Sequence, residues 1–229
     1  MTGAQEIQKN DNPRFYRIVE NLAITTGMQT PKVYVINDPA PNAFATGRDP
    51  KHAIVGATTG LLEIMDDREL EAVMAHEIGH VKNYDIRVTT IAFGLVSVIG
   101  LLSDLALRTL IFGGNDNRNS NANAITLVIG VVVIILAPII AAIIQMAVSR
   151  QREYLADASG ALTTRDSEGL ASALEKLNTY GRPMAEQHSA TANLFFSNPL
   201  KPGFFAKLFS SHPPLEERIA RLRKNADKF

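Results

Sequence analysis

Residues 124–148 limit most strongly how this chain can fold. The run is apolar except for Thr126, Gly130, Pro138 and Gln145. At about 1.5 Å per residue, a helix of this length crosses a bilayer core of about 30 Å with some tilt. The alternative is a central helix of a large soluble core, but globular helices are usually shorter. The sequence therefore predicts a transmembrane helix.

A second apolar stretch, residues 91–112, is the predicted partner span. It contains Asp104 and Arg108, which are four residues apart and can pair on one helix face. Near a membrane boundary, the arginine side chain can also reach the interface. A polar, asparagine-rich stretch, residues 113–121, separates the two spans. We expect it to be the turn of a helical hairpin.

A possible metal-binding motif, His-Glu-Ile-Gly-His, covers residues 76–80. On a helix, His76 and His80 project from the same face and can bind one metal ion, with Glu77 placed to act as a base toward water. The alternative is that both histidines are polar surface of an amphipathic helix. Asp66 as N-cap and Glu69 as its capping-box partner are expected to begin this helix.

A catalytic zinc site normally has three protein ligands, so a third ligand is needed. Glu153 stands out downstream, because Asp157 follows it one helical turn later. Glu153 can bind the metal while Asp157 accepts a hydrogen bond from a ligand imidazole and fixes its tautomer. The alternative is an ordinary charged helix surface. The chain has no cysteine, which leaves histidine and carboxylate as the zinc ligands.

The charge balance argues against nucleic acid as a partner. The chain has 23 basic and 23 acidic residues, so no net field attracts a polyanion. Its mean hydropathy of +0.02 resembles that of a soluble protein. The apolar residues are nevertheless concentrated, as a membrane hairpin inserted into a soluble domain would concentrate them.

Basic residues around the predicted spans indicate an orientation. Those on the side of the metal motif are Lys82, Arg87, Arg150 and Arg152. Between the spans there is only Arg118. Because positive flanks stay in the cytoplasm, we expect the metal site to face the cytoplasm. The hairpin would also explain the long separation between His80 and Glu153, since both of its ends return to the same side.

The remaining segments predict a small sheet and further helices, hence an α+β, mainly helical fold. The predicted strands are residues 32–36, 43–45 and 53–56. The predicted helices run from Asn12 to Gly27, from Asp166 or Ser167 to Gly181, and from Leu215 onward. A small sheet beside a metal-binding helix can accept an extended peptide along its edge.

These motifs occur in the order found in M48 zinc metallopeptidases, together with Asn-Ala-Phe-Ala-Thr-Gly at 42–47 and Ser-His-Pro-Pro at 211–214. From about residue 12 onward, the chain resembles the HtpX-like branch more than the CAAX-processing Ste24 relatives. The resemblance implies one gluzincin-type zincin domain over residues 1–229, into which the hairpin is inserted. It also implies one Zn²⁺ per chain.

The resemblance assigns roles to individual residues. The implied zinc ligands are His76, His80 and Glu153, with Glu77 as base and Asp157 beside a ligand. It gives His212 a hydrogen bond to the oxyanion and places Arg218 near the zinc-site carboxylates or the substrate. Asn42, Ala43 and Phe44 are implied to line the substrate cleft. On the residues alone, Asn42 is a turn residue, His212 begins a helix and Arg218 is a surface charge.

The implied function is hydrolysis of misfolded or damaged membrane proteins in protein quality control and stress response, by a multi-pass enzyme of the inner membrane. A membrane adaptor with a structural zinc site is one alternative. A CAAX-type prenyl-peptide protease is another, but it would need a large intramembrane chamber. The sequence does not specify the oligomeric state.

The beginning of the chain departs from the family pattern. HtpX-like proteins generally have two further spans before the Asn-Ala-Phe region, whereas residues 1–9 here are polar. We expect either a shortened form or a naturally short member. Removing an even number of spans preserves the orientation.

Overall fold

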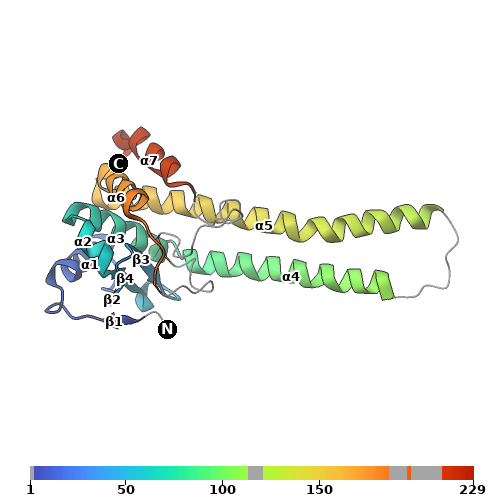
Figure 1. Ribbon diagram of the computed structural model, residues 1–229, viewed down its shortest axis with the longest axis horizontal. Coiled ribbons are helices and arrows are strands. Elements are labelled where there is room, and N and C mark those ends of the chain that lie inside the picture. The colour runs from blue at the N-terminus through green and yellow to red at the C-terminus, as the bar shows by residue number, and fades with distance from the viewer. Residues whose placement is uncertain (1–2, 113–120, 186–194, 197–212) are drawn as a thin grey trace. The chain divides into compact units, whose positions relative to one another are not determined.

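The computed structural model describes residues 3–112, 121–185, 195–196 and 213–229 (Figure 1). The chain divides into two compact units, residues 88–149 and the remainder. The strands and helices are β1 (Ala4–Glu6), α1 (Pro13–Thr26), β2 (Lys32–Ile36), β3 (Ala43–Thr46), β4 (Ile54–Thr58), α2 (Thr59–Ile64), α3 (Asp67–Lys82), α4 (Asp85–Phe112), α5 (Asn121–Thr164), α6 (Ser167–Tyr180) and α7 (Leu215–Lys224). This confirms the predicted α+β, mainly helical class.

The four strands form one mixed sheet in the order β1-β2-β4-β3. β2 and β4 are parallel, whereas β1 and β3 are antiparallel to their neighbours. The prediction of β2 is confirmed residue by residue. The strand predicted at 43–45 extends to Thr46, and the strand predicted at 53–56 begins at Ile54 and extends to Thr58. The parallel register carries β4 to Thr58, opposite Ile36. Because β3 comes last in the order β1-β2-β4-β3, it is the outer strand on one side of the sheet.

β1 was not predicted from the sequence. It has three residues, and Ala4 lies opposite Ile36 in the antiparallel register. A strand this short has too few residues to show a period of two. Its pairing with β2 decides its conformation.

The predicted boundaries of α1 and the predicted start of α3 are confirmed. The Asn12 side chain accepts a hydrogen bond from the Phe15 amide, and Gly27 ends α1 with a φ of 69°, which glycine adopts without steric cost. In α3, Asp66 and Glu69 form the reciprocal capping box. These local interactions set where α3, which carries the metal motif, begins.

One apolar core joins the sheet to α1, α3 and α6. Its fully buried side chains include Phe15, Val19, Leu22, Val55, Leu70, Val73, Met74, Ile78, Leu170 and Leu174. Because these residues come from the sheet and three helices, α3 is held along most of its length. A metal site on this helix therefore rests on a rigid support.

α4 and α5 are long and apolar enough to cross a membrane. The candidate spans are Asp85–Thr109 and Gly130–Thr164. Their most apolar stretches of 18 residues have mean hydropathies of 2.0 and 2.9, and 0% and 6% of those stretches is buried. A core helix of a soluble protein would be largely buried instead. Asp104 and Arg108 form the expected pair, with 2.8 Å between Oδ2 and Nε. The turn expected at residues 113–121 lies almost entirely outside the described residues.

Two features of these helices differ from the sequence expectation. α4 begins at Asp85 rather than at residue 91, and α5 runs without interruption from the apolar span into the segment of Glu153 and Asp157. The third predicted metal ligand thus lies on the same helix as the second predicted span.

Candidate metal centre

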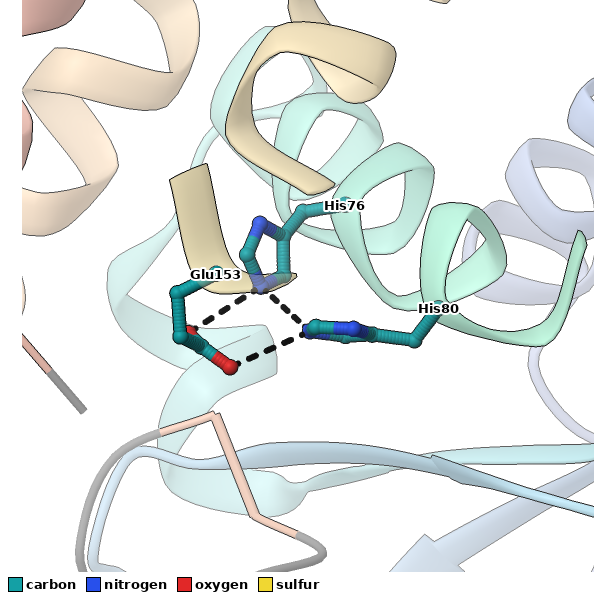
Figure 2. A group of neighbouring side chains, drawn as sticks. All are labelled: His76, His80 and Glu153. Atoms are coloured by element: carbon teal, nitrogen blue, oxygen red, sulfur yellow. Dashed lines mark hydrogen bonds and ion pairs between the residues drawn. The ribbon is translucent and has the colours of Figure 1, made fainter. Parts of the chain in front are cut away.

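Three side chains converge from α3 and α5: His76, His80 and the Glu153 carboxylate (Figure 2). The two histidine Nε2 atoms are 3.0 Å apart. Glu153 Oε1 lies 3.4 Å from His80 Nε2, and Glu153 Oε2 lies 3.8 Å from His76 Nε2. Ligands about 2.1 Å from a tetrahedral zinc ion are separated by roughly 3.4 Å. The geometry and the donor set therefore both fit zinc.

A close crossing of α5 over α3 brings Glu153 to the histidines. A Cβ atom at Gly160 would lie 3.0 Å from the His76 amide nitrogen and 3.2 Å from its Cα atom. Any larger residue would require the helices to separate. Gly160 was not among the predicted site residues, because its importance depends on a contact between distant segments.

The His76 ring is fixed by Asp157 and Arg218. Asp157 Oδ1 lies 3.0 Å from His76 Nδ1. A proton on Nδ1 leaves the Nε2 lone pair directed at the other ligands. Burial, together with the charges of His80 and Arg218, lowers the pKa of His76 to about 4 against the opposing effect of Asp157. The imidazole is thereby kept in the neutral form that binds metals.

Arg218 on α7 is fully buried beside the metal ligands. Its Nε and NH2 atoms donate to the two Asp157 oxygens at 2.9 and 2.6 Å, and its NH1 lies 3.4 Å from Glu153 Oε2. Burial alone would lower the pKa of Arg218, but the Asp157 and Glu153 carboxylates raise it overall. The arginine therefore stays charged and holds Asp157 against His76.

Asp85 fixes the second histidine, and sequence reasoning missed it. Asp85 Oδ2 lies 2.7 Å from His80 Nδ1, and the carboxylate is buried and paired with Arg152. Arg152 also donates to the carbonyl oxygen of Asn83 at 2.7 Å. Tyr84 adopts a φ of 56°, and this left-handed turn brings Asp85 back to the histidine. An acidic residue five positions after His80 was the available signal.

We expect Asp85→Asn to weaken zinc binding by roughly 10- to 100-fold, because the amide cannot stabilise the Nδ1 proton as a carboxylate does. Competition with a chromophoric chelator measures this affinity. Asp67→Asn is the matched control, since Asp67 is an exposed residue of α3 that pairs with Arg14. Equal affinities for Asp85→Asn and the control would exclude this role for Asp85.

Glu77 lies between the metal ligands and the outer strand. It is buried, and the backbone amide of Ala45 in β3 stabilises the charged form of its carboxylate. Burial and the Glu153 charge raise the pKa of Glu77 to about 7 against the effects of His80, Arg218 and that amide. A carboxyl group with a pKa near neutrality is well suited to accept and return a proton.

The remaining predicted residues lie along β3 or outside the described residues. Asn42 is buried just before the strand, and its Oδ1 accepts from the Ala43 amide at 3.0 Å. Ala43 and Phe44 belong to the strand itself. His212 lies outside the described residues.

Comparison with known proteins yields consistent matches. The model of peptidase family M48 matches residues 9–226. A relative named protease HtpX homolog from Tropheryma whipplei (strain Twist) is 62% identical over 229 residues, covering 100% of this chain and 78% of the relative. Homologs of the same name from Dictyoglomus thermophilum and Paraburkholderia phytofirmans are 46% and 48% identical, covering 74% and 79% of their lengths.

The crystal structure of S. mikatae Ste24p shares the fold, with a TM-score of 0.59 at 20% sequence identity. The superposition covers 96% of this chain and 51% of that chain.

Proposed function

Because this chain belongs to peptidase family M48, we propose that it is a zinc-dependent endopeptidase of the HtpX type that hydrolyses misfolded or damaged membrane proteins. The observation that carries the proposal is the His76, His80 and Glu153 ligand group with the buried Glu77 beside it. A structural zinc site would not need a base and normally closes its fourth position with a protein ligand. The arrangement therefore favours catalysis over an adaptor role.

In the proposed reaction, zinc bound by His76, His80 and Glu153 would supply a Lewis acid that polarises the scissile carbonyl and acidifies water. Glu77 accepts a proton from water as the water oxygen forms a bond to the carbonyl carbon. Glu77 then gives this proton to the amine nitrogen as the carbon–nitrogen bond breaks. By family resemblance, His212 donates a hydrogen bond to the oxyanion.

The position of β3 supports unfolded chains as substrates. As the outer strand, it can bind an extended peptide through backbone hydrogen bonds, which do not depend on the substrate sequence. A folded domain does not offer a free extended segment. Partly unfolded membrane proteins offer such segments next to the bilayer.

The test of this function is reversible loss of cleavage on metal removal. We expect the purified full chain in detergent to contain one zinc per chain and to cleave an unfolded protein. A chelator should abolish cleavage, and added zinc should restore it. Zinc binding without any cleavage by the intact protein would instead favour the adaptor.

We place α4 and α5 in the inner membrane as a hairpin, with the metal site on the cytoplasmic side. The support is the apolar surface of both helices and the basic flanks Lys82, Arg87, Arg150 and Arg152, compared with Arg118 alone between the spans.

Labelling of single cysteines tests this orientation. The chain has no cysteine, so one introduced at Asn119 or at the exposed Lys82 is the only thiol. In spheroplasts, an impermeant maleimide should label Asn119→Cys and spare Lys82→Cys, because the basic flanks stay in the cytoplasm. After lysis, both should react. The opposite labelling pattern would reverse the orientation.

A further inference from the structure

Phe195 and Phe196 lie along the outer edge of β3. Phe195 forms an antiparallel bridge with Phe44. The Phe196 amide donates to the carbonyl oxygen of Ala43 at 2.8 Å. These contacts have the pattern of an added antiparallel strand, which is how an extended peptide binds to a sheet edge.

The Phe196 side chain lies directly beside the metal ligands. Its ring centroid is 4.9 Å from that of His76, with an interplanar angle of 82°. The guanidinium carbon of Arg218 lies 5.0 Å from the Phe196 ring centroid. Phe196 is buried, with 3% of its surface exposed. An aromatic side chain thus fills the space next to His76.

Phe195 makes a different set of contacts. Its ring packs edge-on against Phe44, with centroids 5.7 Å apart. It belongs to a separate small apolar cluster with Ile36, Ala40 and Met184. Phe195 therefore anchors the pair to the sheet, whereas Phe196 approaches the metal ligands.

The backbone of β3 places this pair on the path toward Glu77. Residues 43 and 45 of a strand direct their backbone groups to the same side. The Ala43 carbonyl accepts from Phe196, and the Ala45 amide acts electrostatically on the Glu77 carboxylate. A peptide paired with Ala43 along this edge therefore lies two residues along the strand from Ala45, whose amide acts on the proposed base.

We infer that β3 binds an extended substrate segment whose aromatic or large apolar side chain lies beside His76. In the structure, the chain's own residues Phe195 and Phe196 occupy this substrate position. The inference rests on the proposed peptidase function and adds the substrate class. Arg218 is already neutralised by Asp157, so an anionic substrate side chain would lose hydration there without gaining an unpaired cation. A substrate must displace Phe196 before it can bind.

A reversible disulfide tests whether the substrate uses this place. Opposed residues of an antiparallel pair have Cα atoms roughly 4.5–5.5 Å apart, which disulfides span. In Phe44→Cys/Phe195→Cys, the chain has no other thiol, so only this bridge can form. We expect the oxidised protein to cleave an unfolded substrate at least about tenfold more slowly than the same protein after reduction, since the bound pair excludes substrate. Zinc content should be equal in both states.

The outcomes of this experiment are distinct. Each single-cysteine variant is a control whose rate should not respond to oxidant. Equal rates before and after reduction, or failure of the disulfide to form, would overturn the inference. Absence of cleavage by the wild type would instead refute the proposed function.

A peptide series tests the substrate class independently. Quenched peptides that differ only in Phe, Leu, Ala or Asp at one position beside the scissile bond are compared by kcat/KM. We expect the phenylalanine peptide to exceed the aspartate peptide by at least about tenfold. In Phe196→Ala, KM for the phenylalanine peptide should fall while kcat stays unchanged, because the internal competitor is gone.

Phe196→Leu is the conservative control and should keep KM closer to that of the wild type. Thermal unfolding and zinc content show whether each variant is folded. A flat peptide series, or an unchanged KM in folded Phe196→Ala, would contradict the inference.

Discussion

Replacing Glu77 with glutamine is expected to leave zinc bound and to remove most peptide-bond cleavage. Glutamine keeps the size of the side chain and an oxygen that accepts hydrogen bonds, but it cannot take a proton from water. Loss of a general base typically lowers kcat by about 10²- to 10⁴-fold. Zinc content and kcat should be measured on the same preparation, so that loss of the base is separated from loss of the metal.

Two comparisons make the Glu77 result specific. Glu71→Gln is the same substitution on the same helix and outside the ligand group, so it should keep both zinc and activity. His76→Ala should lose both, because it removes a ligand. If Glu77→Gln hydrolysed peptides at the wild-type rate, its role as base would be wrong, whatever the zinc content.

Glu153→Ala and Asp157→Asn are expected to differ in kind. Glu153 supplies an oxygen to the ligand group, so its loss should abolish stoichiometric zinc binding even with excess metal. Within the ligand group, Asp157 contacts the far nitrogen of His76 and supplies no ligand atom itself, so Asp157→Asn should weaken zinc affinity by roughly 10- to 100-fold and recover with added zinc. Equilibrium dialysis over a range of zinc concentrations separates the two results.

The burial of Arg218 adds a stability effect to Asp157→Asn. This substitution leaves a fully buried guanidinium without its main counter-charge, which typically costs about 3–5 kcal/mol. Affinity must therefore be measured below the thermal unfolding midpoint of the variant. Full zinc retention in Glu153→Ala would show that the third ligand lies elsewhere. Equal losses in both variants, without rescue by metal, would reverse the assigned roles.

The sequence by itself determined the features that depend on neighbours in the chain. The capping box at Asp66 and Glu69 marks the start of α3, because its hydrogen bonds are local. The four-residue spacing of His76 and His80 defines one helix face without any tertiary information. Length and apolarity were likewise sufficient to predict helices in both long stretches.

Tertiary structure decided the features that depend on contacts between distant segments. Asp85 becomes a partner of His80 only through the left-handed turn at Tyr84, and Arg218 becomes a buried site residue only because α7 brings it to Asp157. β1 exists because β2 pairs with it, and Phe196 reaches His76 because its backbone pairs with β3. A sequence pattern does not contain these distances. The energy of each contact arises from groups that approach one another only in the folded chain.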